Sequence, residues 1–340
     1  MGRKGQRVYL LLSVVAVAVF WYGPGSLRAQ TPGLQGRVVN GTTNQPVANA
    51  EVQYVLLQQG MAPVAQAKTD AEGRFRFQDV AAPSNAPALL QVEYQGATYS
   101  TPLLPGQSPK EGLDIQVFEA SQQPDLVSVV EQAIYLHPTA DTLMVIEQVM
   151  VENRSNPPKT YVNPQGTYFF TLPGAPREGV QASIQGAMGM PLPQTPVPQK
   201  KANSFALTYP VRPGGTEIRL EYSLDYRPPF EFAKPLDVLA KQTHIVTPGK
   251  DVQVSGESLV ALGADPSTGF EGYRVTPVGN VVRLQVSGQA PAISAGSTVE
   301  SAEEAGGLMP IPDPISRRRW LVLSLLSLVM LAGFVYLYTR

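Results

Sequence analysis

The stretch TEIRLEYSLDY, at residues 216–226, alternates apolar and polar side chains from end to end. A period of two places successive side chains on opposite faces of a β-strand. The apolar set is Ile218, Leu220, Tyr222, Leu224 and Tyr226, and the polar set is Glu217, Arg219, Glu221, Ser223 and Asp225. One face of this strand is therefore predicted to be buried and the other to meet water, as in an antiparallel sheet.

Similar short apolar runs surround this strand. They lie at residues 143–152, 167–172, 204–209, 252–260, 273–275 and 281–286. The chain carries 32 Pro and 30 Gly, which favours short strands and turns over long helices. We predict a β-sandwich at about residues 125–290, immunoglobulin-like in general architecture. The proline-rich stretch at residues 188–201, MGMPLPQTPVPQKK, is expected to be extended on its surface.

A second group of alternating runs precedes this region, at about residues 31–120. Strands are expected at residues 34–39, 50–55, 89–94 and 113–118, with a turn at residues 40–43. Asp70 and Gly73 supply turn chemistry, and Phe75 and Phe77 share one face of the strand that follows them. The fold class expected for the chain is therefore all-β, with two tandem β-sandwiches.

Three motifs of this first region occur in a fixed order. They are G-x-V at residues 36–38, P-V-x-x-A-x-V at residues 46–52 and T-D-x-x-G-x-F-x-F at residues 69–77. In that order they resemble the carboxypeptidase regulatory-like domain, a transthyretin-like β-sandwich. The resemblance covers about a quarter of the chain.

The resemblance implies a fold rather than an activity. The family takes its name from a domain attached to zinc carboxypeptidases, whose catalytic part binds its metal through an HxxE pair and a distant His. Neither His137 nor His244 has Glu three residues later, so the peptidase activity does not carry over. The same fold is grouped with carbohydrate-binding-like sandwiches, which makes contact with a glycan an expectation at the level of the fold.

An uncharged segment near the C-terminus predicts a membrane anchor. It begins at Trp320 and ends at Tyr338, and the basic residues Arg317, Arg318 and Arg319 precede it. At about 1.5 Å of rise per residue it makes a helix roughly 28 Å long, close to the hydrocarbon thickness of a bilayer. We predict a transmembrane anchor at residues 317–340, preceded by a flexible linker at residues 291–316, which is rich in Ala, Ser, Gly and Pro.

The N-terminal 30 residues have the pattern of an export signal. A basic front is followed by an apolar run at residues 8–22, a Gly-Pro-Gly break and the small-residue site Leu27-Arg28-Ala29. We predict a signal peptide at residues 1–30, with an uncleaved anchor as the alternative. The body would then lie on the exported, periplasmic or extracellular side of a single-pass membrane protein. The arginines at residues 317–319 oppose this orientation, because basic residues prefer the cytoplasmic side.

Composition excludes several function classes. With 26 basic and 27 acidic residues the chain shows no electrostatic footprint of nucleic-acid binding. The absence of Cys excludes disulfides, thiolate metal sites and a cysteine nucleophile, and favours a bacterial cell-envelope protein over a disulfide-rich secreted module. No G-x-S-x-G motif occurs. We therefore expect no catalytic residues, cofactor or metal.

The candidate site residues are few. Tyr94 and Tyr99 flank Gln95-Gly96-Ala97 and are the best candidates for a sugar-stacking or partner-binding surface, with strand packing as the alternative. Asp70 and Glu72 fit a hairpin turn better than a calcium loop. Glu217 and Glu221 lie on the polar face of their strand, where they are expected to be solvated.

Two hypotheses for function remain, besides catalysis, which the sequence does not favour. The first is a non-catalytic, membrane-anchored adaptor that binds a protein or glycan partner in the envelope. The second is a structural spacer or assembly subunit of a membrane complex, which docks through the helix at residues 320–338.

Overall fold

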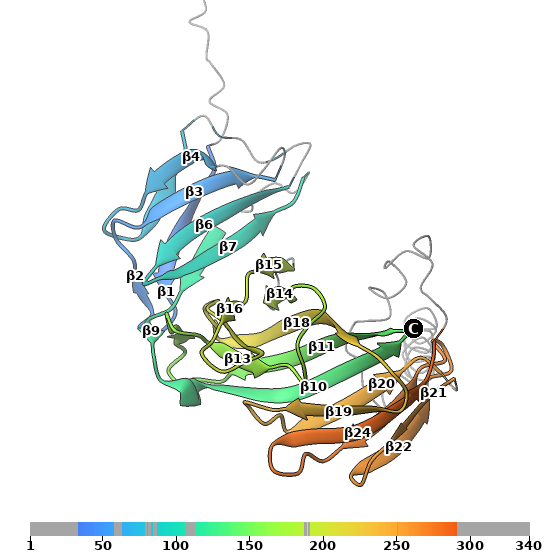
Figure 1. Cartoon of the computed structure of the whole chain (residues 1–340). Coiled ribbons are helices and arrows are strands. Elements are labelled where there is room, and N and C mark those ends of the chain that lie inside the picture. Colours follow the sequence, from blue (N-terminus) through green and yellow to red (C-terminus); the bar gives the residue numbers. More distant parts are fainter. Residues whose placement is uncertain are drawn as a thin grey trace, which may run out of the picture.

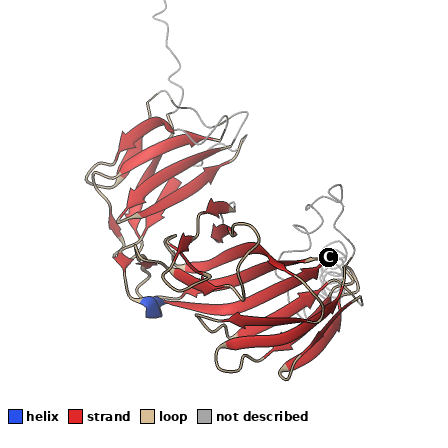
Figure 2. Ribbon diagram, viewed as in Figure 1, coloured by secondary structure: helices blue, strands red, loops and turns tan. Residues whose placement is uncertain are grey.

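The computed structural model describes residues 33–57, 63–78, 80, 83, 87–105, 113–186, 189, 191–249 and 251–290. The predicted signal peptide, linker and transmembrane anchor lie outside these residues. Within the described part of the chain, no helix has the length and apolar character needed to cross a bilayer. Strands make up both lobes of the molecule (Figure 1), and the short 3-10 helix η1 (Pro124–Leu126) lies between them (Figure 2). The all-β prediction is confirmed.

The first domain is a sandwich of two sheets. Its strands are β1 (Gln35–Asn40), β2 (Gln45–Pro46), β3 (Glu51–Leu56), β4 (Pro63–Lys68), β5 (Arg74–Arg76), β6 (Ala88–Tyr94), β7 (Ala97–Leu103) and β8 (Leu113–Val117). One sheet has the order β2-β1-β5, with β8 parallel to β1, and the other has the order β4-β3-β6-β7. Val38, Val52, Phe75, Phe77 and Leu90 belong to the buried core between them.

Each motif of the first domain has a local physical role. A Cβ on Gly36 would meet the carbonyl oxygen of Leu113 at 2.3 Å, so only Gly lets β8 lie against β1 there. The Thr69 hydroxyl donates to the carbonyl oxygen of Val47 (2.7 Å) and accepts from the backbone N–H of Ala50 (2.8 Å), so it holds the loop between β2 and β3. Gly73 has φ +74°, a left-handed conformation that favours glycine, and it closes the turn before β5.

The second domain is larger and contains three principal sheets. Its strands are β10 (Val127–Pro138), β11 (Thr142–Asn153), β13 (Tyr168–Thr171), β14 (Gln181–Gly186), β15 (Leu192–Gln194), β16 (Val197–Pro198), β17 (Ser204–Leu207), β18 (Gly214–Asp225), β19 (Phe230–Pro235), β20 (Gln242–Thr247), β21 (Val252–Ser255), β22 (Leu259–Ala264), β23 (Glu271–Val275) and β24 (Val281–Gly288). An eight-stranded sheet has the order β15-β14-β18-β11-β10-β20-β23-β22, and the smaller sheets are β13-β17-β16 and β19-β24-β21.

The eight-stranded sheet has one buried and one half-buried face. Along β18 the predicted alternation is confirmed, because Ile218, Leu220, Tyr222 and Leu224 are each at most 3% exposed. The polar residues between them are half-buried rather than freely solvated. The buried face packs against the smaller sheets and forms the core of this domain. The other face, called the outer face below, carries the polar residues of β18.

Two expectations for the second domain were wrong. An immunoglobulin sandwich has two antiparallel sheets, of which the larger has about four or five strands, whereas this domain has one sheet of eight strands in which β10 and β20 run parallel. The predicted single strand at residues 252–260 is two strands, β21 and β22, in different sheets. Gly256 lies between them, where a Cβ would meet the carbonyl oxygen of Arg283 at 2.9 Å. The proline-rich stretch contributes the extended strands β15 and β16.

Candidate functional site

The hairpin that carries Tyr94 and Tyr99 turns through Gln95 and Gly96. These two residues have φ of 48° and 79°, as a tight turn between right-twisted strands requires. The Tyr94 hydroxyl donates to a carboxylate oxygen of Glu119 at 2.9 Å, and the Gln95 amide donates to the other oxygen at 2.6 Å. These bonds, that of Gln95 first, lower the pKa of the Glu119 carboxyl.

Tyr99 points into the junction between the two domains. Its side chain is 3% exposed, and its hydroxyl donates to the carbonyl oxygen of Phe118 at 3.1 Å. The same hydroxyl lies 2.7 Å from that of Thr160 in the second domain. Burial raises the pKa of Tyr99. The Tyr99 ring therefore has no face free for stacking on a sugar. Tyr94 is partly exposed, and contact between Tyr94 and a ligand stays a prediction.

Backbone pairing strengthens this junction. The short strands β9 (Ala120–Ser121) and β12 (Thr160–Tyr161) run parallel and form a two-stranded sheet. The Thr42 hydroxyl of the first domain donates to the carbonyl oxygen of Pro158 at 2.5 Å. The guanidinium carbon of Arg212 lies 6.0 Å from the centre of the Tyr99 ring, within the range of a cation–π contact. The two domains are thus joined by side-chain hydrogen bonds, by backbone strand pairing and by a cation–π contact.

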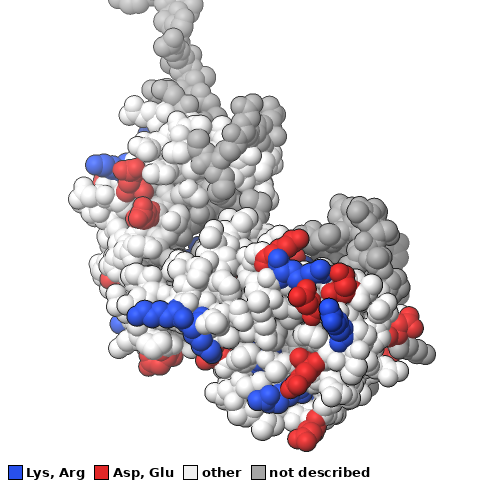
Figure 3. Space-filling view, in the orientation of Figure 1, with Lys and Arg blue, Asp and Glu red and all other residues white. Residues whose placement is uncertain are grey.

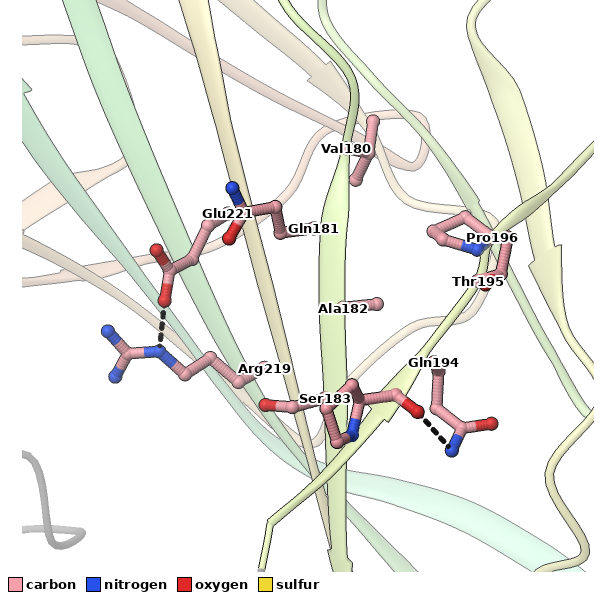
Figure 4. Close-up of a pocket in the computed structure, with 10 residues that line it drawn as sticks. Val180, Gln181, Ala182, Ser183, Gln194, Thr195, Pro196, Arg219 and Glu221 are labelled. Carbon is pink, nitrogen blue, oxygen red and sulfur yellow. Dashed lines mark hydrogen bonds and ion pairs between the residues drawn. The ribbon is translucent and has the colours of Figure 1, made fainter. Parts of the chain in front are cut away.

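A groove lies beside β14, at the opposite edge of the large sheet from β22. Its volume is about 370 Å³, and its lining residues are Val180, Gln181, Ala182, Ser183, Pro193, Gln194, Thr195, Pro196, Arg219 and Glu221. In Figure 4, Gln181, Arg219 and Glu221 lie on one side of β14 and Pro196 on the other. The Arg219 Nε donates to a carboxylate oxygen of Glu221 at 2.6 Å. Amide, hydroxyl and charged residues are therefore among those that line the groove.

The strand register extends this polar site across the outer face. Ser183 of β14 pairs with Arg219, and Arg219 pairs with Gln148 of β11. The same row continues across β10 to His244 of β20 and ends at Arg274 of β23, next to Val260 of β22. Paired residues share a face of the sheet. Ala133 of β10 interrupts this row, so hydrogen-bonding side chains lead from the groove as far as Gln148 and resume at His244.

Burial on this outer face affects two ionisable groups. It raises the pKa of the Glu217 carboxyl, and the nearby Arg219 only partly offsets this. It also raises the pKa of the Tyr135 hydroxyl. Glu217 and Glu221, which the sequence placed on a solvated strand face, therefore lie on a face that is partly withdrawn from water.

The sequence did not reveal a buried ionic cluster in the second domain. Glu147 and Lys234 are 0% and 1% exposed, and their charged atoms lie 2.8 Å apart. Tyr222 and Gln132 donate to the two carboxylate oxygens, at 2.6 and 2.8 Å. Lys234 also donates to the carbonyl oxygen of Thr171 at 2.8 Å. Glu147 has the same phase on β11 as the buried residues Val145 and Val149, and this inward phase is the signal that could have identified it.

Neither His137 nor His244 belongs to a cluster of metal-ligating residues within the described part of the chain. The His244 Nε2 lies 3.8 Å from a carboxylate oxygen of Glu131, and no group of three or more His, Asp or Glu in the described ranges is arranged to hold a metal ion. Asp70 accepts from the backbone N–H groups of Glu72 (3.0 Å) and Arg74 (2.8 Å). Its carboxylate therefore caps the hairpin turn, as the turn interpretation predicts.

Comparison with known proteins gives a family for the first domain. The model of the carboxypeptidase regulatory-like domain matches residues 33–117. A search of curated protein sequences gave no match. Among solved structures, an M1 zinc metallopeptidase from Deinococcus radiodurans is 14% identical, with a TM-score of 0.27, over 47% of this chain and 42% of that one. A two-domain M1 zinc metallopeptidase mutant bound to L-tryptophan is 15% identical, also with a TM-score of 0.27, over 51% and 46% of the two chains.

These structural likenesses are too weak to carry an inference about fold or activity, and the chain spans less than half the length of either metallopeptidase. The family match is of a different kind, because its bounds contain all three motifs and the whole first sandwich. Residues 33–117 are therefore a carboxypeptidase regulatory-like domain, as the sequence motifs predicted.

Proposed function

We propose that this chain is a non-catalytic, membrane-anchored adaptor on the exported side of a bacterial envelope, and that it binds a protein or glycan partner through the groove beside β14. The groove is the observation that carries this proposal. Its amide, hydroxyl, carboxylate and guanidinium groups can exchange hydrogen bonds with sugar hydroxyls or with the backbone of an extended peptide.

The carboxypeptidase regulatory-like domain supports a non-catalytic assignment. Its core consists of apolar side chains. The carboxylates of Asp70 and Glu72 form ion pairs with Arg74 in the hairpin turn. The membrane anchor and the exported orientation rest on the sequence patterns at residues 320–338 and 1–30, respectively.

A spacer or assembly subunit is the second candidate. The junction around Tyr99 favours it, because two domains fixed to each other by β9 and β12 can hold a partner at a set distance from a bilayer. In this alternative the helix at residues 320–338 docks within a membrane complex, and no ligand enters the groove.

Binding by the full chain in lipid nanodiscs separates these functions. The chain is presented to a glycan array and, as bait, to solubilised envelope proteins, alongside an Arg219→Ala/Glu221→Ala variant. Arg37→Ala/Asp114→Ala is the matched control, because that exposed ion pair, at 2.9 Å, lies on the first domain and neither residue lines the groove.

We expect a specific glycan or protein to bind, with affinity at least tenfold weaker for the groove variant and unchanged for the control. Binding that both variants retain would contradict the groove assignment. If nothing binds, and replacing residues 320–338 with an unrelated anchor removes the chain from a complex, the spacer function holds instead.

A further inference from the structure

The two edges of the eight-stranded sheet differ in their capacity to accept another strand. At one edge, β15 has three residues, and Pro193 among them has no N–H to donate. At the other edge, β22 has the sequence LVALGA, six residues without a charge or a proline. Within the described residues, β22 pairs with β23 alone. The β22 edge is therefore open, whereas the β15 edge is blunted.

Large apolar side chains are exposed along the open edge. Val260 and Leu262 of β22 are 60% and 50% exposed. The pairing with β23 shifts between Ala261 and Gly263, so Leu262 is the extra residue of a bulge. A protein surface seldom leaves such residues grouped on an edge unless something covers them.

Two neighbouring loops add to this apolar edge. Val278, 66% exposed, lies in the loop after β23, where the N–H of Thr276 donates to the carbonyl oxygen of Ser258 at 3.2 Å. Leu239, which is 52% exposed, lies in the loop after β19. In that loop the Leu236 N–H donates to the carbonyl oxygen of Asn280, which belongs to the loop of Val278. Exposed apolar groups thus run from these loops along β22.

The last described residue, Ala290, lies at one end of the large sheet. The N–H of Ala290, the last described residue, donates to the carbonyl oxygen of Pro138 at the end of β10. Because β20 runs parallel to β10, the loop of Leu239 lies at the opposite end of the sheet from Pro138. The chain therefore leaves the domain at the end of the sheet opposite the loop of Leu239.

We propose that the apolar edge is covered by the same edge of a second copy of this chain, with two β22 strands pairing antiparallel about a two-fold axis. An open edge requires an extended partner strand, and every copy presents one. Because residues 259–264 carry no charge, self-pairing places no like charges opposite each other. A two-fold contact of this kind is closed, so it gives a dimer and not a fibre.

Charge substitution at the two-fold contact tests the proposal. Leu262→Lys and Leu262→Glu are made in the full chain and examined in nanodiscs or detergent by native mass spectrometry and sedimentation. We expect the unmodified chain to be dimeric and each variant alone to dissociate at least tenfold more readily. An equal mixture of the two variants should restore a heterodimer, which shows that both variants still fold. Val64→Lys is the matched control, because Val64 is 56% exposed on another edge strand, β4.

Single-cysteine variants locate the contact independently, since the chain has no Cys. Under mild oxidation Ala261→Cys should form a covalent dimer and Val64→Cys should not. A monomeric unmodified chain at micromolar concentration would overturn the proposal. A dimer that survives both charge variants, with no cross-link at position 261, would also overturn it and place self-association in the membrane segment.

Discussion

The core of the first domain is uncharged, whereas the core of the second encloses an ion pair. Asn40 and Thr69 are the buried polar residues among the described part of the first domain. In the second domain, Glu147 and Lys234 lie between the large sheet and the strand β19. The first core is specified by short local motifs, and the second by a contact between residues that are far apart in the sequence.

This difference explains why the first domain carries a recognisable sequence motif. Gly36, Thr69 and Gly73 each perform a task that only one or two residue types can perform, so the motif is visible in the sequence. The ion pair of the second domain has no such local signature.

The largest effect is expected from breaking the buried ion pair. Lys234→Met leaves the Glu147 carboxylate buried without its cation, and such a loss destabilises by about 3–5 kcal/mol. Urea unfolding with hydrogen exchange across β10 and β11 measures it. Lys201→Met is the control, because Lys201 makes an exposed ion pair with Asp237 at 3.9 Å, and surface pairs contribute about 0–1 kcal/mol. Equal effects of the two variants would contradict the distinction between the cores.

The turn glycine of the first domain should have the next largest effect. A Cβ on Gly73 would meet the carbonyl oxygen of Val38 at 2.6 Å, so Gly73→Ala adds a clash to backbone strain and costs about 1–3 kcal/mol. Gly96 has a similar φ of 79° and open space around it, so Gly96→Ala should cost roughly 1 kcal/mol. Hydrogen exchange across β3 and β6 reports both. A larger loss of stability in Gly96→Ala than in Gly73→Ala would contradict a role for the close contact between Gly73 and Val38.

A smaller effect is expected at the junction between the domains. Tyr99→Phe removes a buried hydroxyl bonded to Phe118 and close to Thr160, at a cost of about 1 kcal/mol. In Tyr99→Phe, backbone hydrogen exchange should become faster at β9 and β12 in particular. Tyr94→Phe is the control, because its hydroxyl bonds within the first domain. An unchanged exchange rate at β12 in Tyr99→Phe would show that this residue does not hold the domains together.

The smallest effect is a dependence on pH. Hydrogen bonds to Glu119 lower the pKa of its carboxyl in the folded protein below the ordinary 4.5. The stability it contributes is therefore fully present above about pH 4.5 and is lost as the pH falls through the folded pKa. Glu119→Gln should be less stable than the unmodified chain near pH 6, and the difference should shrink towards pH 3. Unfolding midpoints across this range measure it, and a difference that grew in acid would have the wrong sign.

The sequence predicted the strands whose alternation is regular and whose turns carry Gly, Asp or Asn. β18 and the motifs around Gly73 are of this kind. It did not predict the pairing of β10 with β20, because parallel neighbours are brought together by the whole sheet and not by a turn.

The candidate site was harder to predict than the strands. Tyr94 and Tyr99 are both aromatic residues near a loop in the sequence, but Tyr99 is buried at the domain junction whereas Tyr94 is partly exposed. The groove needs β14, β15 and β18 to be adjacent, and no local pattern encodes that adjacency. Figure 3 shows charged side chains of both signs in small clusters on one face of the molecule, with uncharged surface between them, so composition alone does not locate a site there.

Hydrogen exchange of the full chain in nanodiscs, with and without the glycan or protein that it captures, tests the proposed function most directly. We predict slower exchange in β14 and β15, at Gln181–Gly186 and Leu192–Gln194, and no change in the hairpin of Tyr94. Protection confined to β6 and β7 would contradict the groove assignment and return the binding surface to Tyr94 and the first domain.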